Sequence, residues 1–87
     1  MRWQPGVSMP IVFRHGAYSF FFYSNEGSPR EAVHIHVRNA DGEAKFWLTP
    51  VSVAYSHGFG ARTLRELANV VEDNLGLIER AWHEHFA

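Results

Sequence analysis

The stretch VHIHVRNADGEAKFWLT, residues 33–49, decides the fold that this sequence of 87 residues predicts. Two runs of alternating side chains flank an Asp41-Gly42 pair, a pattern typical of two antiparallel strands, residues 33–38 and 43–49, joined by a tight turn. Successive side chains of a strand point to opposite faces. The apolar set of the first run should face the core: Val33, Ile35 and Val37. The polar set should face away from it: His34, His36 and Arg38.

Three further extended runs surround this hairpin, at residues 11–16, 18–24 and 51–56. The last of them follows Pro50 and is expected to be a short edge strand. Residues 25–32 contain Asn25, Gly27, Ser28 and Pro29, the composition of a loop. Residues 1–9 hold two breakers and no apolar period, so we expect an N-terminal arm followed by one domain over residues 10–87.

The last third of the chain carries an apolar stripe with a helical period. At about 100° per residue, the members of the stripe fall within roughly 60° of one direction: Leu64, Leu67, Ala68, Val71, Leu75, Ile78, Trp82 and Phe86. The stripe keeps its phase through Gly76, which predicts one helix over residues 62–85, weakened there by about 1 kcal/mol. Thr63 and Glu66 can form a capping box, and Gly60 offers an earlier cap. The predicted fold class is α+β, a small antiparallel sheet of three to five strands packed on one long C-terminal helix.

Composition excludes several classes of protein. The chain has no cysteine, which excludes disulfides and thiolate metal centres and is consistent with a cytoplasmic location. No apolar run is long enough to span a membrane, and the first ten residues lack the apolar core of a secretory signal. A formal net charge of −1 does not favour nucleic acid as a partner.

The sheet face that points away from the helix should gather the polar and aromatic side chains. If Ala44, Phe46 and Leu48 pack on the helix, Lys45 and Trp47 point away from it. The second strand adds either Phe20 and Phe22 or Phe21 and Tyr23. The predicted binding surface has six members: Tyr23, His34, His36, Arg38, Lys45 and Trp47. We expect both histidines of this surface to be accessible to solvent.

Two chemistries are possible on this surface. A metal-independent ribonuclease needs a general acid, a general base and cations that hold phosphate, and His34, His36, Arg38 and Lys45 are the catalytic candidates. Aromatic rings such as those of Trp47 and Tyr23 can stack bases. The His-x-His pair can instead bind a metal, but a stable site needs a third ligand, for which His57, Asp41 and Glu43 are the candidates. Because that ligand is not assured, we predict no tightly bound metal and no cofactor.

The helix carries a second apolar set outside its core stripe. Its members are a candidate seam for a partner protein or for a second copy of the chain: Val70, Leu77 and Ala81. At the end of the helix, His83 and His85 are expected to interact with the helix dipole, which is a structural role.

Several segments resemble a small bacterial family, the domain of unknown function 4160. These segments are YSFFFYSNEG, HIHV, GEAKFWLTPV, LRELANVVEDN and AWHEHF, and the resemblance covers nearly all of residues 9–86. Ala32-Val33 stands where the family usually has two prolines, and Gly60 where many members have a serine cap. The resemblance implies a partner protein encoded nearby, in a candidate toxin–antitoxin pair. We therefore expect a protein-interaction module rather than an enzyme. A small RNA-binding or ribonuclease-like protein is the first alternative, and a weak histidine-based metal binder is the second.

Overall fold

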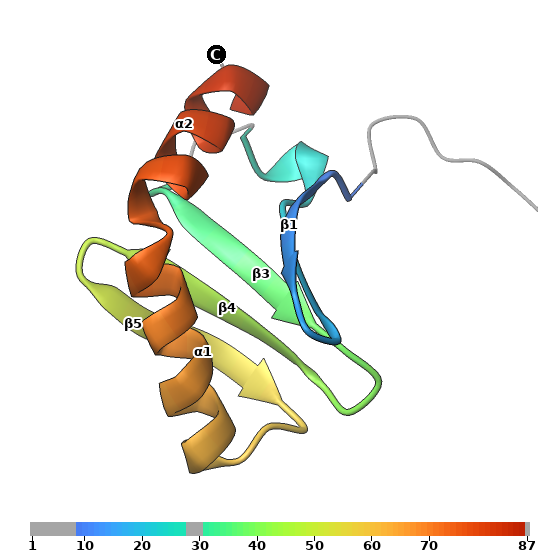
Figure 1. Ribbon diagram of the computed structural model, residues 1–87. Helices are drawn as coiled ribbons and strands as arrows, with labels where there is room; N and C mark the ends of the chain where they lie inside the picture. Colours follow the sequence, from blue (N-terminus) through green and yellow to red (C-terminus); the bar gives the residue numbers. More distant parts are fainter. Residues whose placement is uncertain (1–8, 28–30, 87) are drawn as a thin grey trace, which may run out of the picture.

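The computed structural model describes residues 9–27 and 31–86, in which a five-stranded antiparallel sheet carries two helices on one face (Figure 1). The strands are β1 (Ile11–His15), β2 (Tyr18–Phe21), β3 (His34–Arg38), β4 (Glu43–Leu48) and β5 (Val51–His57). A 3-10 helix, η1 (Ser24–Gly27), follows β2, and the helices α1 (Ala61–Asp73) and α2 (Leu75–Phe86) complete the chain. The α+β class is confirmed. Residues 1–8 of the predicted arm lie outside the described residues.

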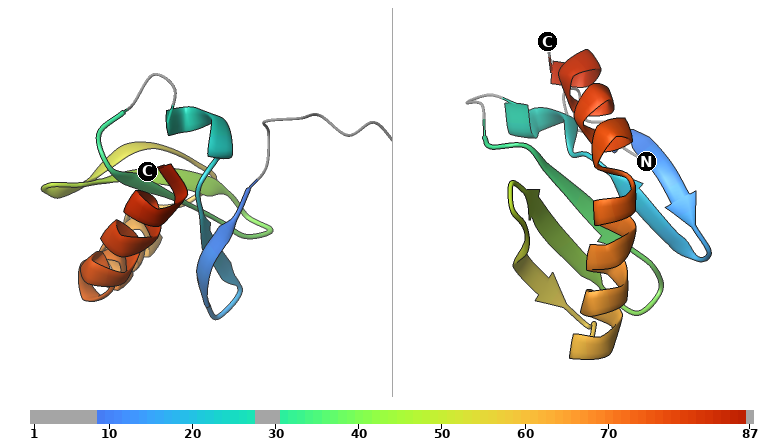
Figure 2. Two further views of the ribbon diagram at one scale, coloured as in Figure 1. Left: turned by 90° about the horizontal axis from the view of Figure 1, so that it is seen from above. Right: turned by 60° about the vertical axis from the view of Figure 1, so that its left-hand side comes forward.

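Each strand of the sheet pairs with its neighbour in sequence, so the spatial order is β1-β2-β3-β4-β5. A bulge interrupts the pairing of β1 with β2 near Val12. Figure 2 shows the β1–β2 hairpin bent toward the side of the sheet that carries the helices. Phe13 and Phe20 stack there with ring centroids 4.5 Å apart. The curved sheet therefore encloses the apolar face of the helices on more than one side.

The hairpin between β3 and β4 is confirmed, but its turn differs from the one that Asp41-Gly42 suggests. The amide of Asn39 donates to the Gly42 carbonyl at 3.1 Å, so the turn centres on Ala40 and Asp41, one residue earlier. The Asn39 side chain accepts hydrogen bonds from the amides of Asp41 and Gly42, at 2.8 and 3.2 Å. Gly42 is needed for a different reason, since a Cβ there would collide with the backbone carbonyl of His57.

The prediction of one continuous helix is wrong, because the chain breaks at Asn74 into α1 and α2. The amide of Asn74 bonds to the carbonyl of Val71 at 3.0 Å, and its side-chain amide donates to the carbonyl of Val70 at 2.8 Å. An asparagine side chain that bonds nearby backbone competes with the helical pattern in this way. The carbonyl of Asn74 then accepts from Ile78, which starts the next helix. Gly76 lies inside α2.

The apolar stripe nevertheless keeps its direction across the break. Leu67 and Val71 of α1 and Ile78 and Trp82 of α2 are all buried in one core. The core side of the sheet contributes Phe20, Phe22, Ile35, Val37, Ala44, Phe46 and Leu48. Each large side chain in such a core contributes about 1.5–3 kcal/mol to folding. α1 begins at Ala61 with Gly60 as its N-cap and no side-chain cap hydrogen bond, so the earlier of the two predicted caps is the one in use.

Candidate functional site

The six residues of the predicted binding surface lie on the sheet face opposite the helices, which we call the outer face. Across the β3–β4 ladder, His34 is the partner of Trp47, His36 of Lys45, and Arg38 of Glu43. Partners in an antiparallel ladder share a face. Phe21 of β2 is the partner of His36, whereas Phe20 and Phe22 are in the core, so the second strand presents Phe21 and Tyr23 to the outer face. The assignment of faces from the alternating pattern is therefore confirmed.

The expectation that both histidines are accessible to solvent is wrong. His34 and His36 each have 0% of their surface exposed, as little as Ile35 and Val37 on the core side. Rings from other elements cover both imidazoles. Tyr23 packs edge-on against His36 with ring centroids 4.6 Å apart, and Phe21 lies stacked near it at 5.5 Å.

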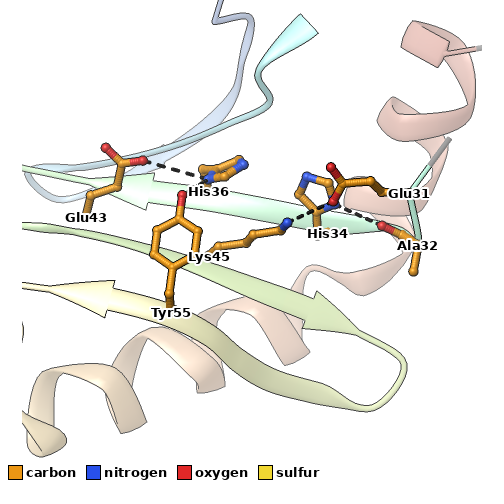
Figure 3. A network of polar contacts seen from close by, with 7 residues as sticks. All are labelled: Glu31, Ala32, His34, His36, Glu43, Lys45 and Tyr55. Carbon is orange, nitrogen blue, oxygen red and sulfur yellow. Dashed lines mark hydrogen bonds and ion pairs between the residues drawn. The ribbon is translucent and has the colours of Figure 1, made fainter. Parts of the chain in front are cut away.

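His36 is held in a cluster of polar groups drawn from three strands and the segment after β2. Figure 3 shows the three members on the strands, His36, Glu43 and Tyr55. Its Nδ1 lies 3.3 Å from the hydroxyl of Tyr55 and 3.8 Å from the carboxylate of Glu43. Tyr23 donates a hydrogen bond of 3.0 Å to that same carboxylate. We call these four residues the His36 cluster. Among the described residues, no buried side-chain nitrogen or oxygen lacks a hydrogen-bond partner, so the cluster is polar but satisfied.

His34 occupies a different environment at the start of β3. Its Nδ1 donates to the carbonyl of Ala32 at 2.9 Å, which fixes the ring orientation. β2 pairs with β3 only as far as His36, and beyond that point Trp82 of α2 packs against the His34 ring at 4.9 Å. Trp47 lies edge-on at 5.7 Å. His34 therefore contributes to the packing between the outer face and α2.

The two cations of the predicted surface are also engaged. Lys45 is buried, donates to Glu31 at 2.9 Å, and has its ammonium 4.4 Å from the centre of the Trp47 ring. Arg38 is exposed, with its guanidinium 5.2 Å from the Phe21 ring. A cation over an aromatic face is attracted by the ring quadrupole. Both cations thus stabilise the outer face itself.

Sequence reasoning missed two residues of this face, Tyr55 and Glu31. Tyr55 is the partner of Lys45 in the β4–β5 ladder, so continuing the alternation past Pro50 would have placed it on the outer face. A bulge on β5 between Val53 and Tyr55 makes that count uncertain by one residue, which is enough to reverse the faces. Glu31 lies outside any strand and carries no local signal of its position.

The arrangement limits the chemistry that the outer face can perform. A general acid or base must come within hydrogen-bond reach of its substrate, and neither histidine has exposed surface. Within residues 9–27 and 31–86, no three histidine or acidic side chains come together as metal ligands. His57 is exposed at the end of β5, and Asp41 is exposed at the hairpin turn.

The predicted seam of Val70, Leu77 and Ala81 is only partly exposed. Val70 and Ala81 are half-buried and pack against the core, whereas Leu77 has 39% of its surface exposed. Leu77 instead shares a groove of about 390 Å³ with β1, where Ile11 is 44% exposed. The remaining large apolar residues with this degree of exposure in the described part are Val53 and Tyr55, both on β5.

These features define a small α+β domain with a satisfied polar cluster around the buried His36 and apolar side chains exposed along its two edge strands. Residues 17–83 match the family described as Domain of unknown function (DUF4160), and the chain belongs to that family. Neither a search of curated proteins nor a search of solved structures finds a match for it. In the described part of the chain, neither helix has the length and apolar character needed to cross a membrane.

Proposed function

We propose that this protein is a protein-interaction module, one component of a two-protein bacterial system of the toxin–antitoxin type. The observation that carries the proposal is the division of side chains between the inside and the outside of the domain. The two histidines that the sequence offers as acid–base candidates on the outer face, His34 and His36, are fully buried, whereas large apolar side chains are exposed on both edge strands. Contiguous exposed apolar surface marks a site of association, and Ile11 and Leu77 line one groove.

The edge strands add a reason to expect a protein as the partner. β1 and β5 each end the sheet, so each has one row of backbone groups with no strand beside it in the described structure. Such a row is a template for another chain, because a partner strand can satisfy the free amides and carbonyls. RNA offers neither an extended backbone of that kind nor apolar side chains for Ile11 and Leu77.

The experiment is coexpression in the cytoplasm with the protein encoded by the adjacent gene, with an affinity tag on one partner only. We expect the two proteins to copurify and to elute together at one stoichiometry in size-exclusion chromatography. An unrelated small domain with the same tag serves as the control. Failure of the two proteins to copurify would overturn the proposal. So would RNA cleavage by the purified chain that is lost in His36→Gln while the fold is retained.

A further inference from the structure

The two edges of the sheet are protected to different degrees. β1 has five residues and ends in Arg14 and His15. β5 has seven residues with the sequence VSVAYSH, and no lysine, arginine, acidic residue, proline or glycine lies within it. Natural edge strands are usually short or carry lysine, proline or a bulge, which prevents pairing with other chains. β5 has only one of these devices, the bulge between Val53 and Tyr55.

Hydrogen-bonded and non-bonded pairs alternate along an antiparallel ladder, so the direction of each backbone group on β5 can be assigned. The amide of Leu48 donates toward the segment that begins β3, so Lys45, three residues earlier, directs its backbone groups toward β5. Tyr55, the ladder partner of Lys45, directs its own backbone amide and carbonyl toward β4. Ser56, next to Tyr55, therefore directs its amide and carbonyl to the free edge. Past the bulge Val53 is opposite Phe46, which directs its groups toward β3, so the groups of Val53 also face the free edge.

Side chains on both faces of β5 would be covered by an added strand. Val53 lies on the helix side with 43% of its surface exposed, and Tyr55 lies on the outer face with 40% exposed. On the helix side a groove of about 310 Å³ borders this edge, lined by Ser52 and Val53, by Phe46, and by Ala61, Leu64 and Arg65 of α1. Pockets beside an edge strand are where strand-adding domains bind alternate side chains of their ligand.

The charge around this groove is positive. Arg65 lines the groove, and Arg62 lies exposed in the first turn of α1. In the described part of the chain, neither side chain takes part in a hydrogen bond or ion pair. The first turn of α1 contains no acidic residue, and Gly60 supplies no side-chain cap, so the partial positive charge of the helix terminus adds to that of the arginines. Glu66 lies about 100° further round the helix than Arg65 but only about 40° from Arg62, four residues earlier, so Arg65 is the cation that gives the groove its positive charge.

We infer that the β5 edge binds an extended segment of a partner protein that carries alternating apolar side chains and acidic residues next to Arg65. Backbone hydrogen bonds to Val53 and Ser56 supply the pairing, and the groove beside α1 takes an apolar side chain. A second copy of β5 is a poorer occupant. Two-fold pairing of the two β5 strands would bring the Arg65 side chains of both copies beside the same strand pair, where their positive charges repel. This inference rests on the proposed function, since it names the chemistry of the protein partner.

The test uses the whole chain and a synthetic peptide of about ten residues with alternating Val and Thr and three Asp at one end, a length that matches a strand pair. A second peptide has Lys in place of Asp. Residue-resolved amide exchange measured by NMR reports on the edge. At about 1 mM acidic peptide, we expect the Val53 and Ser56 amides to exchange at least about threefold more slowly, and the effect to weaken with added salt. The Lys peptide should give no protection.

Charge reversal provides the decisive comparison. Arg65→Glu should lose protection by the Asp peptide and gain it from the Lys peptide. Arg14→Glu makes the same change at the opposite edge and should behave as the unmodified chain. Val53→Glu should abolish protection by the Asp peptide, whereas Val53→Thr, which keeps the branched shape without a charge, should retain it.

Three outcomes would overturn the inference. They are equal protection by both peptides, no protection by the Asp peptide, and protection that appears without peptide and rises with protein concentration. The last would identify a second copy as the occupant. A complex with the neighbouring gene product that leaves the β5 amides unprotected would also overturn the inference, but it would leave the proposed function intact.

Discussion

Strands β3 and β5 lie on either side of β4 in the same sheet and carry histidines on the same face. Solvent reaches the histidine of β5 and neither histidine of β3. His36 has 0% of its surface exposed, and its ring nitrogen hydrogen-bonds to the Tyr55 hydroxyl. His57, the ladder partner of Glu43 at the end of β5, is exposed. β3 has a strand on both sides, and β5 has one on a single side. The position of a strand in the sheet therefore separates a stabilising role for histidine from an accessible one.

Amide exchange gives the largest contrast between the two strands. The amides of Ile35 and Val37 are buried and directed to β4, so they should exchange only through large-scale opening. Those of Val53 and Ser56 face the free edge. We expect the β3 amides to exchange at least about a thousandfold more slowly, since domain stabilities are at least about 5 kcal/mol. Similar rates for the two pairs would mean that β5 is covered in the isolated protein.

Removal of the His36 side chain should cost the most stability. His36→Ala leaves a cavity and removes the ring nitrogen that pairs with the Tyr55 hydroxyl, so we expect a loss of about 3 kcal/mol in the free energy of unfolding. His57→Ala is the matched control on β5 and should change that free energy by less than about 0.5 kcal/mol. Urea unfolding of the two variants measures the difference. Equal effects would contradict the division between buried and exposed histidines.

Tyr55 connects the two regions, because its ring is exposed on β5 and its hydroxyl bonds to a buried residue of β3. Tyr55→Phe should lower the free energy of unfolding by about 1 kcal/mol, the value of one hydrogen bond. Tyr18→Phe is the control, since in the described part of the chain the Tyr18 hydroxyl makes no hydrogen bond. His36→Phe removes the same hydrogen bond. The double variant should therefore lose less free energy of unfolding than the sum of the losses of the two single variants.

The alternation of side chains predicted which residues share the outer face, because that property depends on strand geometry alone. The burial of His34 and His36 could not be predicted in the same way. It depends on Tyr23, Tyr55 and Trp82, whose rings come from distant parts of the sequence. In an alternating pattern, a histidine between branched apolar residues is assigned to the solvent side. A buried imidazole is nevertheless stable once its nitrogens have hydrogen-bond partners.

The helix break shows a different limit. The apolar stripe depends on which side of the helix faces the core. The break at Asn74 alters that side too little to remove the stripe, which is buried in both α1 and α2. Asn74 is the residue in the sequence that signals the break, because its side chain bonds the carbonyl of Val70. The sequence analysis considered only Gly76 as a weak point of the helix. An exposed position in the first turn of α2 should still favour alanine over glycine, because the backbone there is helical.

Gly76 on the exposed side of α2 tests that statement with the smallest expected effect. Its φ is not positive, and a Cβ there would meet only the guanidinium of Arg80, at an ordinary contact distance of 3.7 Å. Gly76→Ala should stabilise the fold by about 0.5–1 kcal/mol, because alanine favours the helix and restricts the unfolded chain. Gly60→Ala is the control: it has equal space but lies at an N-cap, where alanine is a poor residue, so it should be neutral or destabilising.

The two glycine variants also bear on the comparison between β3 and β5, since both positions are open to solvent like the β5 edge. If Gly76→Ala raised the urea midpoint and Gly60→Ala did not, local backbone preference would govern the exposed parts of this domain. A lower midpoint for Gly76→Ala would mean that the exposed flank of α2 is covered in solution. The groove of Leu77 and Ile11 lies on the same helix, and it would then be the surface to examine for the contact.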